Sequence, residues 1–367
     1  MGNEKKIPKK ILLVDDSALM RRVLCDILNK DERFEVAGRA SDGQEALELM
    51  GKKDFDAVVL DISMPRMDGL QMLREMRKRR IPARVMMLSA YTYEGAKLLL
   101  EALSLGALDF MHKPNTLADW DIGSYQEMLL ETLDIVANGE FPVYDSEEGS
   151  RKKEAVKESA PPKAPVSLGS SSGIRIVAIA SSTGGPRALQ SVIPRLPKEL
   201  DAPVLLVQHM AKGFTGSLAE RLDSLSSLNV KEAKEGEEIA KGTVYVSMGG
   251  QHMTVRRSPG GKHVIRYTDE PTREGVKPCA NYMYESLIES GYDPIICVVL
   301  TGMGADGTEG IQALRKAKNT YVIAQNQETC TVYGMPKSAV NAGLVDEVIP
   351  LEQIAREIVT RVGVRNA

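Results

Sequence analysis

The feature of this sequence that most constrains its fold is a repeated alternation of short apolar runs with longer amphipathic segments. Two series of such units occur, and a polar stretch rich in Pro and Ser separates them. Continuous runs of Val, Ile and Leu predict parallel strands that are buried on both faces by helices. A chain of 367 residues is long enough for two such cores. We therefore predict an α/β protein with two doubly wound parallel-sheet domains.

The limits of the predicted domains follow from where the alternation stops. The first series spans residues 8–138 and the second spans residues 174–367. Between them, residues 139–173 contain EGSRKKEAVKESAPPKAPVSLGSSSG, which is polar and has no apolar period. This composition predicts a flexible linker. Such a tether raises the effective concentration of one domain near the other, so docking between the two domains is expected.

Composition excludes several classes of function. The net charge of −3 offers no large basic field for nucleic acid. The four cysteines show no C-x-x-C spacing, which argues against disulfides and zinc sites and suits a reducing compartment. The first residues lack the apolar core of a signal peptide, and no apolar run is long enough to span a bilayer. We expect a cytoplasmic protein that neither binds nucleic acid nor inserts into a membrane.

Polar side chains lie where the predicted strands of the first series end. They are Asp15, Asp16, Asp61, Ser89 and Lys113. The carboxyl ends of parallel strands meet at one edge of the sheet, so these groups should lie close together. Neighbouring carboxylates repel one another unless a hard cation joins them, and Mg²⁺ binds carboxylates together with phosphate oxygens. In such a site Asp61 can accept a phosphoryl group as an acyl phosphate, with Lys113 and Ser89 beside its oxygens.

The same residues resemble the response-regulator receiver family. The matching features are the DD pair after the first strand, D-x-x-M-P-x-M-D-G from Asp61, a hydroxyl residue after the fourth strand and K-P after the fifth. The resemblance implies phosphorylation at Asp61. It also implies Mg²⁺ held by Asp16, Asp61 and the backbone carbonyl of Ser63, with Asp15 in support.

The resemblance carries two further expectations for this domain. Ser89 and Lys113 are implied as the residues that respond to phosphorylation. The peptide bond between Lys113 and Pro114 is implied to be cis, which is the minority state of an X-Pro bond.

In the second series, IRIVAIASSTGGPRAL at residues 174–189 predicts a buried strand, a sharp turn and a helix. A serine raised on such a turn, beside the free N–H groups of a helix start, is the arrangement of a nucleophile elbow. The elbow pattern G-x-S-x-G aligns with Ala180 to Gly184 and centres on Ser182. Ser181 is then expected to point toward the sheet. A phosphate-binding or connecting loop has the same outline, so the turn alone does not establish catalysis.

Two other strand ends complete a possible catalytic set. His209 follows VLLVQ and Asp306 lies after IICVVL, so both converge with Ser182 if the three strands are neighbours. A serine hydroxyl needs an adjacent base, and a carboxylate can orient that base. His209 is favoured over His252 as the base because its strand is the more apolar. His263 sits in an alternating strand and is expected to face solvent.

A G-x-G-x-x-G motif at residues 302–307 also invites a dinucleotide-binding interpretation. Such a site needs an acidic residue at the tip of the next strand, and that strand ends TYVIAQNQ. The glycines are better explained by a tight turn that presents Asp306 and leaves the N–H of Met303 free.

The motifs ASSTGGP, VQHM and LTGMGADG, in this order behind a receiver, are similar to those of the chemotaxis protein-glutamate methylesterase (CheB) family. The resemblance implies hydrolysis of glutamate γ-methyl esters on chemoreceptors, and deamidation of receptor glutamines. Ser182 is implied as nucleophile, His209 as base and Asp306 as its orienting acid. The backbone N–H groups of Met303 and Thr183 are implied as the oxyanion hole, with no metal in this domain.

Regulation and partners follow from the same resemblance. The implied phosphodonor is the chemotaxis histidine kinase, and the implied substrates are methyl-accepting chemotaxis receptors. The unphosphorylated receiver is expected to dock over the edge that bears Ser182, and phosphorylation of Asp61 to shift this docking. The alternative is a non-catalytic signalling module that docks onto partners. The intact set of Ser182, His209 and Asp306 favours the enzyme.

Overall fold

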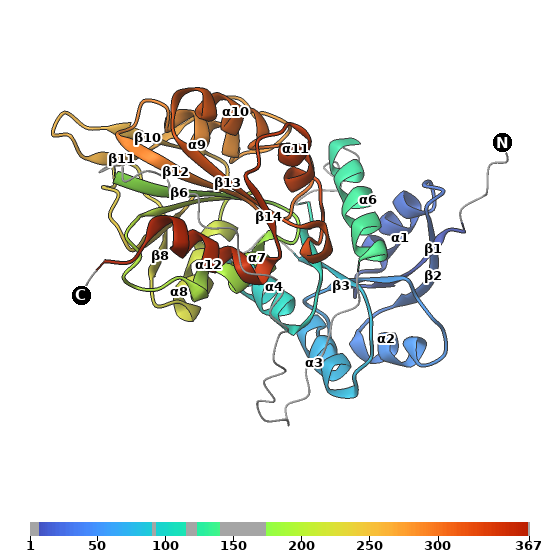
Figure 1. Ribbon diagram of the computed structural model, residues 1–367. Coiled ribbons are helices and arrows are strands. Elements are labelled where there is room, and N and C mark those ends of the chain that lie inside the picture. Colours follow the sequence, from blue (N-terminus) through green and yellow to red (C-terminus); the bar gives the residue numbers. More distant parts are fainter. Residues whose placement is uncertain (1–6, 90–92, 115–122, 140–173, 366–367) are drawn as a thin grey trace, which may run out of the picture.

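The computed structural model of the chain describes residues 7–89, 93–114, 123–139 and 174–365. These residues form two α/β units, each built around its own parallel sheet (Figure 1). The linker predicted at 139–173 lies outside the described residues, apart from its first position. No helix within the described ranges is long and apolar enough to cross a bilayer.

The first sheet has five parallel strands in the order β2-β1-β3-β4-β5. This doubly wound order reverses direction between β1 and β3, which is where such folds place their sites. The strands are β1 (Lys9–Val14), β2 (Phe34–Ala40), β3 (Ala57–Asp61), β4 (Val85–Ser89) and β5 (Asp109–His112), and the helices are α1 (Ala18–Leu28), α2 (Gly43–Met50), α3 (Gly69–Arg79), α4 (Tyr93–Leu105) and α6 (Gly123–Asn138).

Side-chain caps begin three helices of this unit. The Ser17 hydroxyl accepts a hydrogen bond from the Met20 N–H at 3.3 Å at the start of α1. The Asp42 carboxylate caps α2, and Asp68 forms a reciprocal capping box with Gln71 at the start of α3. Each cap satisfies N–H groups that have no partner inside the helix, so these polar residues define where the helices begin.

The second sheet has seven strands in the order β14-β13-β12-β6-β7-β9-β8, and a separate antiparallel hairpin joins β10 to β11. Its strands and those of the hairpin are β6 (Ile174–Ser181), β7 (Val204–Gln208), β8 (Asn229–Glu232), β9 (Thr243–Val246), β10 (His252–Arg257), β11 (His263–Thr268), β12 (Tyr292–Val299), β13 (Thr320–Gln325) and β14 (Glu347–Ile349). The helices are α7 (Gly185–Val192), α8 (Phe214–Leu225), α9 (Ala280–Ser286), α10 (Thr308–Ala317), α11 (Met335–Asn341) and α12 (Leu351–Val362), with 3₁₀ turns η1 (Ile193–Arg195) and η2 (Gln327–Thr329).

Helices cover both faces of the second sheet (Figure 1). Val177 and Ile179 of β6 face the core shared with α7, α8 and α12. Ile176 and Ala178 of the same strand face the opposite core, shared with α9, α10 and α11. Successive strand residues point to opposite faces, so a run that is apolar at every position must be buried on both sides.

The predicted fold class is confirmed, with two doubly wound parallel sheets. The sequence did not predict β8 or β14, which lie at the two edges of the second sheet. β8 reads NVKE and β14 has three residues, so neither shows an apolar run. Short, charged edge strands are common because they resist pairing with other chains, and the same property hides them from a hydrophobicity pattern.

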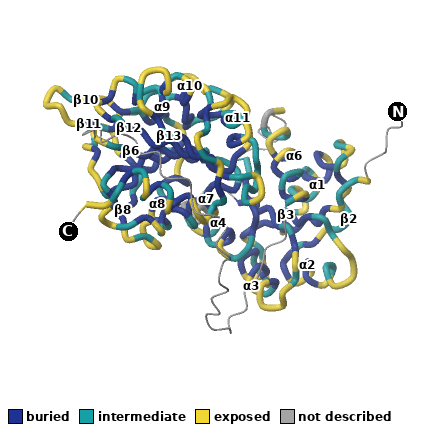
Figure 2. The backbone as a smooth tube through the Cα atoms, in the orientation of Figure 1, coloured by how far each residue is buried: buried dark blue, intermediate teal, exposed yellow. Residues whose placement is uncertain are grey.

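The two units pack on each other through α4 of the first and α7 and α8 of the second. Phe110 of β5 stacks on Phe214 of α8, with ring centroids 6.2 Å apart. Lys97 of α4 pairs with Glu220 of α8 at 3.1 Å. The largest apolar cluster contains residues of both units, and buried segments meet at this contact (Figure 2). The first unit therefore packs on the helices that follow the serine turn (α7) and the histidine turn (α8).

Asp109 lies buried at this contact, at the start of β5. Its carboxylate accepts the N–H of Phe110 at 2.8 Å and faces the N–H of Gly184 in the serine turn of the other unit. Burial raises the pKa of Asp109 to about 7, and the two N–H groups only partly oppose this shift. A carboxyl whose folded-state pKa exceeds its unfolded value binds more protons in the native state over the interval between the two.

We predict that ionisation of Asp109 weakens the folded, docked protein as pH rises from about 4 to about 7. Asp109→Asn removes this ionisation. The melting temperature of the variant minus that of the wild type should therefore be larger at pH 8 than at pH 5. Asp26→Asn, which changes an exposed acid, is the matched control. Differential scanning calorimetry at both pH values tests this. The prediction is wrong if the gain of Asp109→Asn is the same at both pH values.

Candidate active site

The three strands that carry the predicted catalytic residues are adjacent at the centre of the second sheet. β6 pairs in parallel with β12 on one side and with β7 on the other. The Ser182 N–H donates to the Thr301 carbonyl at 3.0 Å, and the His209 N–H donates to the Ser181 carbonyl at 3.0 Å. The turns that follow the three strands are therefore held together at one edge, as convergence of the three side chains requires.

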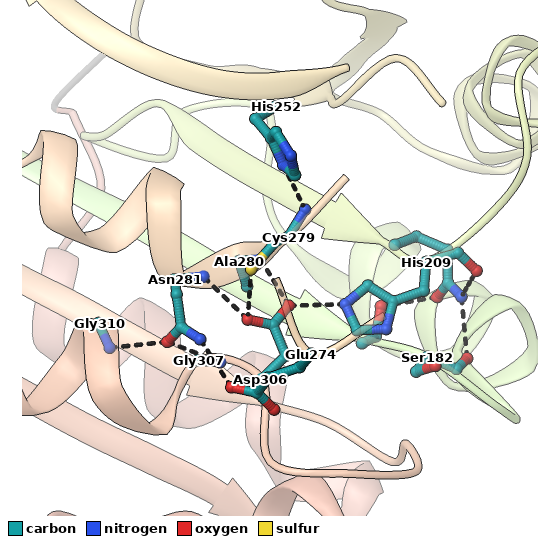
Figure 3. Close-up of polar contacts among 12 residues, drawn as sticks. Ser182, His209, His252, Glu274, Cys279, Ala280, Asn281, Asp306, Gly307 and Gly310 are labelled. Carbon is teal, nitrogen blue, oxygen red and sulfur yellow. Dashed lines mark hydrogen bonds and ion pairs between the residues drawn. The ribbon is translucent and has the colours of Figure 1, made fainter. Parts of the chain in front are cut away.

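His209 and Asp306 form a direct pair in this edge. Nε2 of His209 lies 2.7 Å from Oδ2 of Asp306, and both side chains are largely buried (Figure 3). Burial by itself raises the pKa of Asp306, but the hydrogen bond and charge of His209, together with neighbouring donors, hold that pKa below its ordinary value. Asp306 is therefore a carboxylate at neutral pH and can orient the imidazole.

Ser182 lies on the neighbouring turn and is partly exposed (Figure 3). Because Nε2 of His209 is bound to Asp306, Nδ1 is the ring nitrogen that remains for the serine. In the described part of the chain the Ser182 hydroxyl makes no hydrogen bond. Nucleophile–base contacts are often long before substrate binds and shorten in the complex, so the arrangement is compatible with proton transfer.

Gln208 ties the serine turn to the histidine turn, and sequence reasoning missed it. Its side-chain oxygen accepts the Ser181 hydroxyl at 2.7 Å. Its amide nitrogen donates to the carbonyls of Ser182 at 2.9 Å and His209 at 3.2 Å. A Cβ at Gly185 would lie 2.0 Å from the Gln208 side-chain oxygen, so glycine is required there. A polar residue ending the otherwise apolar run VLLVQ was the available signal.

The loop after β12 brings a second backbone turn against the serine. A Cβ at Gly302 would lie 2.8 Å from the Cβ of Ser182 and 2.4 Å from the sulfur of Met335. Gly307 has φ of 93°, a conformation that side chains disfavour. The glycines of the G-x-G-x-x-G motif thus serve the close packing of this turn. The backbone N–H groups of Met303 and Thr183 have no acceptor within the described residues, which leaves them available for an oxyanion.

His252, the alternative base, has a different place. It is buried, its Nδ1 accepts the Cys279 N–H at 3.1 Å, and its Nε2 donates to the Pro271 carbonyl at 3.2 Å. Burial lowers the pKa of His252, which favours the neutral ring that this pattern needs. His252 therefore supports the segment that leads into α9 (Figure 3).

The prediction that His263 faces solvent is wrong. Its side chain is buried, its ring lies 4.1 Å from that of Tyr292 between centroids, and its Nε2 accepts the Gly291 N–H at 2.9 Å. The hairpin folds back on the start of β12, and this long-range packing covers a residue that an isolated alternating strand would expose.

In the first unit, the polar groups predicted from the strand ends also converge. Ligand oxygens of Asp15, Asp16 and Asp61 all lie within 4.8 Å of one another. Lys113 Nζ lies 2.6 Å from Asp15 and 2.9 Å from Asp61. Burial raises the pKa of Asp61, and Lys113 partly opposes that rise. A set of three close carboxylates suits a hard divalent cation. Ser89 is buried at the end of the adjacent strand β4.

The expected cis bond between Lys113 and Pro114 is wrong. Cis bonds occur in the described residues at Lys277–Pro278 and Asp293–Pro294. The trans form is the lower-energy default for an X-Pro bond, and Lys113 reaches both carboxylates from it.

We predict that Gly302→Ala displaces Ser182, because its added Cβ meets the serine and a sulfur of the supporting loop. A displacement near 1 Å typically costs about 100-fold in rate. The rate at which an alkyl fluorophosphonate labels Ser182 should fall by about that factor. Gly123→Ala is the control, since its Cβ would meet nothing within 4 Å. Labelling of Gly302→Ala at the wild-type rate would contradict the prediction.

Comparison with known proteins gives a consistent result over the whole chain. A family model described as CheB methylesterase matches residues 177–358, and one described as response regulator receiver domain matches residues 11–120. A protein-glutamate methylesterase/protein-glutamine glutaminase 1 of Syntrophomonas wolfei is 42% identical over 358 residues, which cover 96% of this chain and 99% of that protein. A protein-glutamate methylesterase/protein-glutamine glutaminase of Bacillus subtilis is 41% identical, with 95% and 97% covered.

The solved structures agree. The crystal structure of the Thermotoga maritima CheB methylesterase catalytic domain has a TM-score of 0.50 and 43% sequence identity to this chain. The match covers 52% of this chain and 99% of that domain. With relatives at this identity matched along almost their full length, a receiver ahead of the second sheet, and the serine turn and His–Asp pair at that sheet's edge, this chain belongs to the CheB methylesterase family.

Proposed function

We propose that this chain is a phosphorylation-activated serine hydrolase that converts glutamate γ-methyl esters on chemoreceptors to glutamate and methanol, in chemotaxis adaptation. It also deamidates receptor glutamines, because ester and amide react through the same kind of tetrahedral intermediate. The observation that carries the proposal is the 2.7 Å contact between His209 and Asp306 beside the Ser182 turn. The names of the full-length relatives support the choice of substrate.

In the proposed mechanism, Ser182 Oγ attacks the ester carbonyl while Nδ1 of His209 takes its proton. Asp306 keeps the ring in the required tautomer and stabilises the imidazolium. The free N–H groups of Met303 and Thr183 bind the oxyanion, and one such donor is typically worth about 3 kcal/mol in the transition state. His209 then protonates the leaving methoxide, and water activated by the same ring hydrolyses the acyl-enzyme.

We propose residues 8–138 as the receiver, 139–173 as the linker and 174–367 as the catalytic domain. In the receiver, Asp16, Asp61 and the Ser63 carbonyl would hold Mg²⁺, with Asp15 in support. The cation supplies charge neutralisation for phosphoryl transfer. The Asp61 carboxylate attacks the phosphorus of the phosphodonor, the bond from that phosphorus to the donor breaks, and Asp61 becomes an acyl phosphate.

Lys113 and Ser89 are proposed to sense the phosphoryl group. Lys113 already bridges Asp15 and Asp61, so added negative charge at Asp61 changes the balance of its contacts. Ser89 lies at the end of β4, directly before α4 in the chain, and α4 packs on the catalytic domain. Phosphorylation at Asp61 thereby shifts the docked arrangement, which in the unphosphorylated protein restricts access to the serine turn.

The proposed partners follow from this reaction. Methyl-accepting chemotaxis receptors are the substrates and a chemotaxis histidine kinase is the phosphodonor. Nucleic acid has no part in the reaction. The reaction needs receptor segments and a kinase that face the cytoplasm, so we propose that the protein acts there.

We predict that Ser182→Ala lowers methanol release from a methylated receptor fragment by at least about 10⁴-fold, because the nucleophile is lost. Ser181→Ala is the comparison, since that hydroxyl is buried against Gln208 rather than presented at the surface. It should keep activity within about tenfold. Release by Ser182→Ala at the wild-type rate would remove the mechanism. Absence of release by the wild type would favour a non-catalytic signalling module.

We predict that a small phosphodonor with Mg²⁺ raises the esterase rate of the wild type and leaves Asp61→Asn at its basal rate. The amide cannot form an acyl phosphate. Asp54→Asn, a change at an exposed acid seven positions earlier, should respond like the wild type. Chelation of Mg²⁺ should abolish the response, and deletion of residues 1–150 should raise the basal rate. Equal stimulation of Asp61→Asn would place the phosphorylated residue elsewhere.

A further inference from the structure

The carboxylate of Asp306 accepts more hydrogen bonds than its pairing with His209 requires. Oδ2 accepts the Ala280 N–H at 2.6 Å in addition to His209. Oδ1 accepts the Asn281 N–H at 3.0 Å and the Cys279 thiol at 3.0 Å (Figure 3). Three consecutive residues at the entry to α9 therefore surround the acid with donors, and one of these donors is a side chain.

Cys279 is fully buried, and its thiol donates to this acid. The backbone N–H of Cys279 donates to Nδ1 of His252 at 3.1 Å. His252 is fixed in turn by the Pro271 carbonyl at 3.2 Å. Burial and the neighbouring Asp306 carboxylate raise the pKa of the Cys279 thiol, so the group stays protonated and donates. His252 thus holds the backbone of Cys279 in place beside Asp306.

The neighbouring segment is braced in the same way. The side-chain oxygen of Asn281 accepts the N–H groups of Gly307 at 3.1 Å and Gly310 at 2.7 Å. Its amide nitrogen donates to Glu274 at 3.0 Å (Figure 3). The loop that carries Asp306 and the segment that donates to it are therefore locked together, which prevents the acid from turning away from its donors.

We propose that Cys279 is a positioning residue of the candidate triad, whose thiol limits the negative charge that Asp306 offers to the His209 ring. A carboxylate shares its charge among its donors, so each added donor makes it a weaker partner for an imidazolium. A thiol is a weak donor and takes only part of that charge. The inference rests on the proposed hydrolase function, in which the basicity of His209 sets the fraction of active enzyme at neutral pH.

The other ionisable groups around Asp306 do not interfere with a measurement of the protonation of His209. Burial lowers the pKa of His252, and the nearby Lys277 ammonium lowers it further. Burial raises the pKa of the Tyr284 hydroxyl well above its usual value. Glu274 reaches Asp306 only through Asn281. His209 is the imidazole that contacts the Asp306 carboxylate directly, so the protonation of its ring is the readout for the charge of Asp306.

The test measures that titration directly in the full-length chain. Histidine-selective ¹⁵N labelling gives the titration midpoint of each ring by NMR, and His209→Gln identifies the signal of His209. Cys279→Ala removes a donor, so the His209 midpoint should rise by about 0.5 pH unit. Cys279→Ser replaces the thiol with a stronger donor, so the midpoint should fall below that of the wild type. The acid limb of kcat/KM for methanol release should move in the same directions.

Cys297→Ala is the matched control. Cys297 is also a fully buried thiol of this domain, in β12, and it makes no contact with Asp306 among the described residues. Its replacement costs packing without changing the donors of the acid, so the His209 midpoint should equal that of the wild type. A shift in Cys297→Ala as large as in Cys279→Ala, or no shift in Cys279→Ala, overturns the proposal.

Two further outcomes are separable. If Cys279→Ala does not fold, Cys279→Ser decides: a lowered midpoint supports the proposal and an unchanged midpoint overturns it. If the wild type releases no methanol while the midpoints shift as stated, the proposed hydrolase function fails and the role of Cys279 toward Asp306 stands. If the wild type releases methanol but the His209 midpoint is the same in Cys279→Ala and in the wild type, the hydrolase function stands and the role of Cys279 fails.

Discussion

The parallel pairing of β6 with β7 and β12 is the constraint on which the candidate active site depends. Hydrogen-bonded strands lie about 4.8 Å apart, so the turns that leave one edge of three adjacent strands are within side-chain reach of one another. This pairing brings Ser182, His209 and Asp306 together although as many as 124 positions separate them along the chain, from 182 to 306. The strands themselves are apolar on both faces, so polar groups are concentrated at their ends.

Asp306 and Gln208 are buried among these polar groups, and hydrogen bonds to nearby residues offset the free energy of removing them from water. Asp306 would be strongly destabilised inside the protein without partners, and His209 with the donors at the entry to α9 supplies them. The amide of Gln208 is satisfied by Ser181 and by the two carbonyls it joins. Buried polar groups whose partners are all present form a rigid network. The His209–Asp306 pair is therefore held in place before substrate binds, and Gln208 holds the backbone of the turn that carries Ser182.

In the first domain an ammonium group supplements the hydrogen bonds that the buried carboxylates accept from the Ser17 and Ile62 N–H groups. Three carboxylates meet at the switch point of its sheet, and the ammonium of Lys113 stands between two of them. The domain contact then links this cluster to the serine turn through β5 and α4. Phe110 packs on α8, and the neighbouring Asp109 faces Gly184 of the turn. Contacts of β5 thus join the unit that carries Asp61 to the turn that carries Ser182.

The sequence by itself determined the fold class, the two sheets and the polar residues at their strand ends, because apolar runs and turn glycines are local signals. It could not determine the order of the strands, since pairing joins segments far apart in the chain. For that reason the tertiary structure alone showed the bridging role of Gln208 and the thiol of Cys279 beside Asp306. It also decided the burial of His263, which lies in the hairpin and packs on Tyr292, and the edge strands β8 and β14. Each of these depends on a partner from a distant segment, which no pattern within one segment can encode. The bond before Pro114 is trans, the ordinary state of an X-Pro bond, where the family resemblance had implied cis.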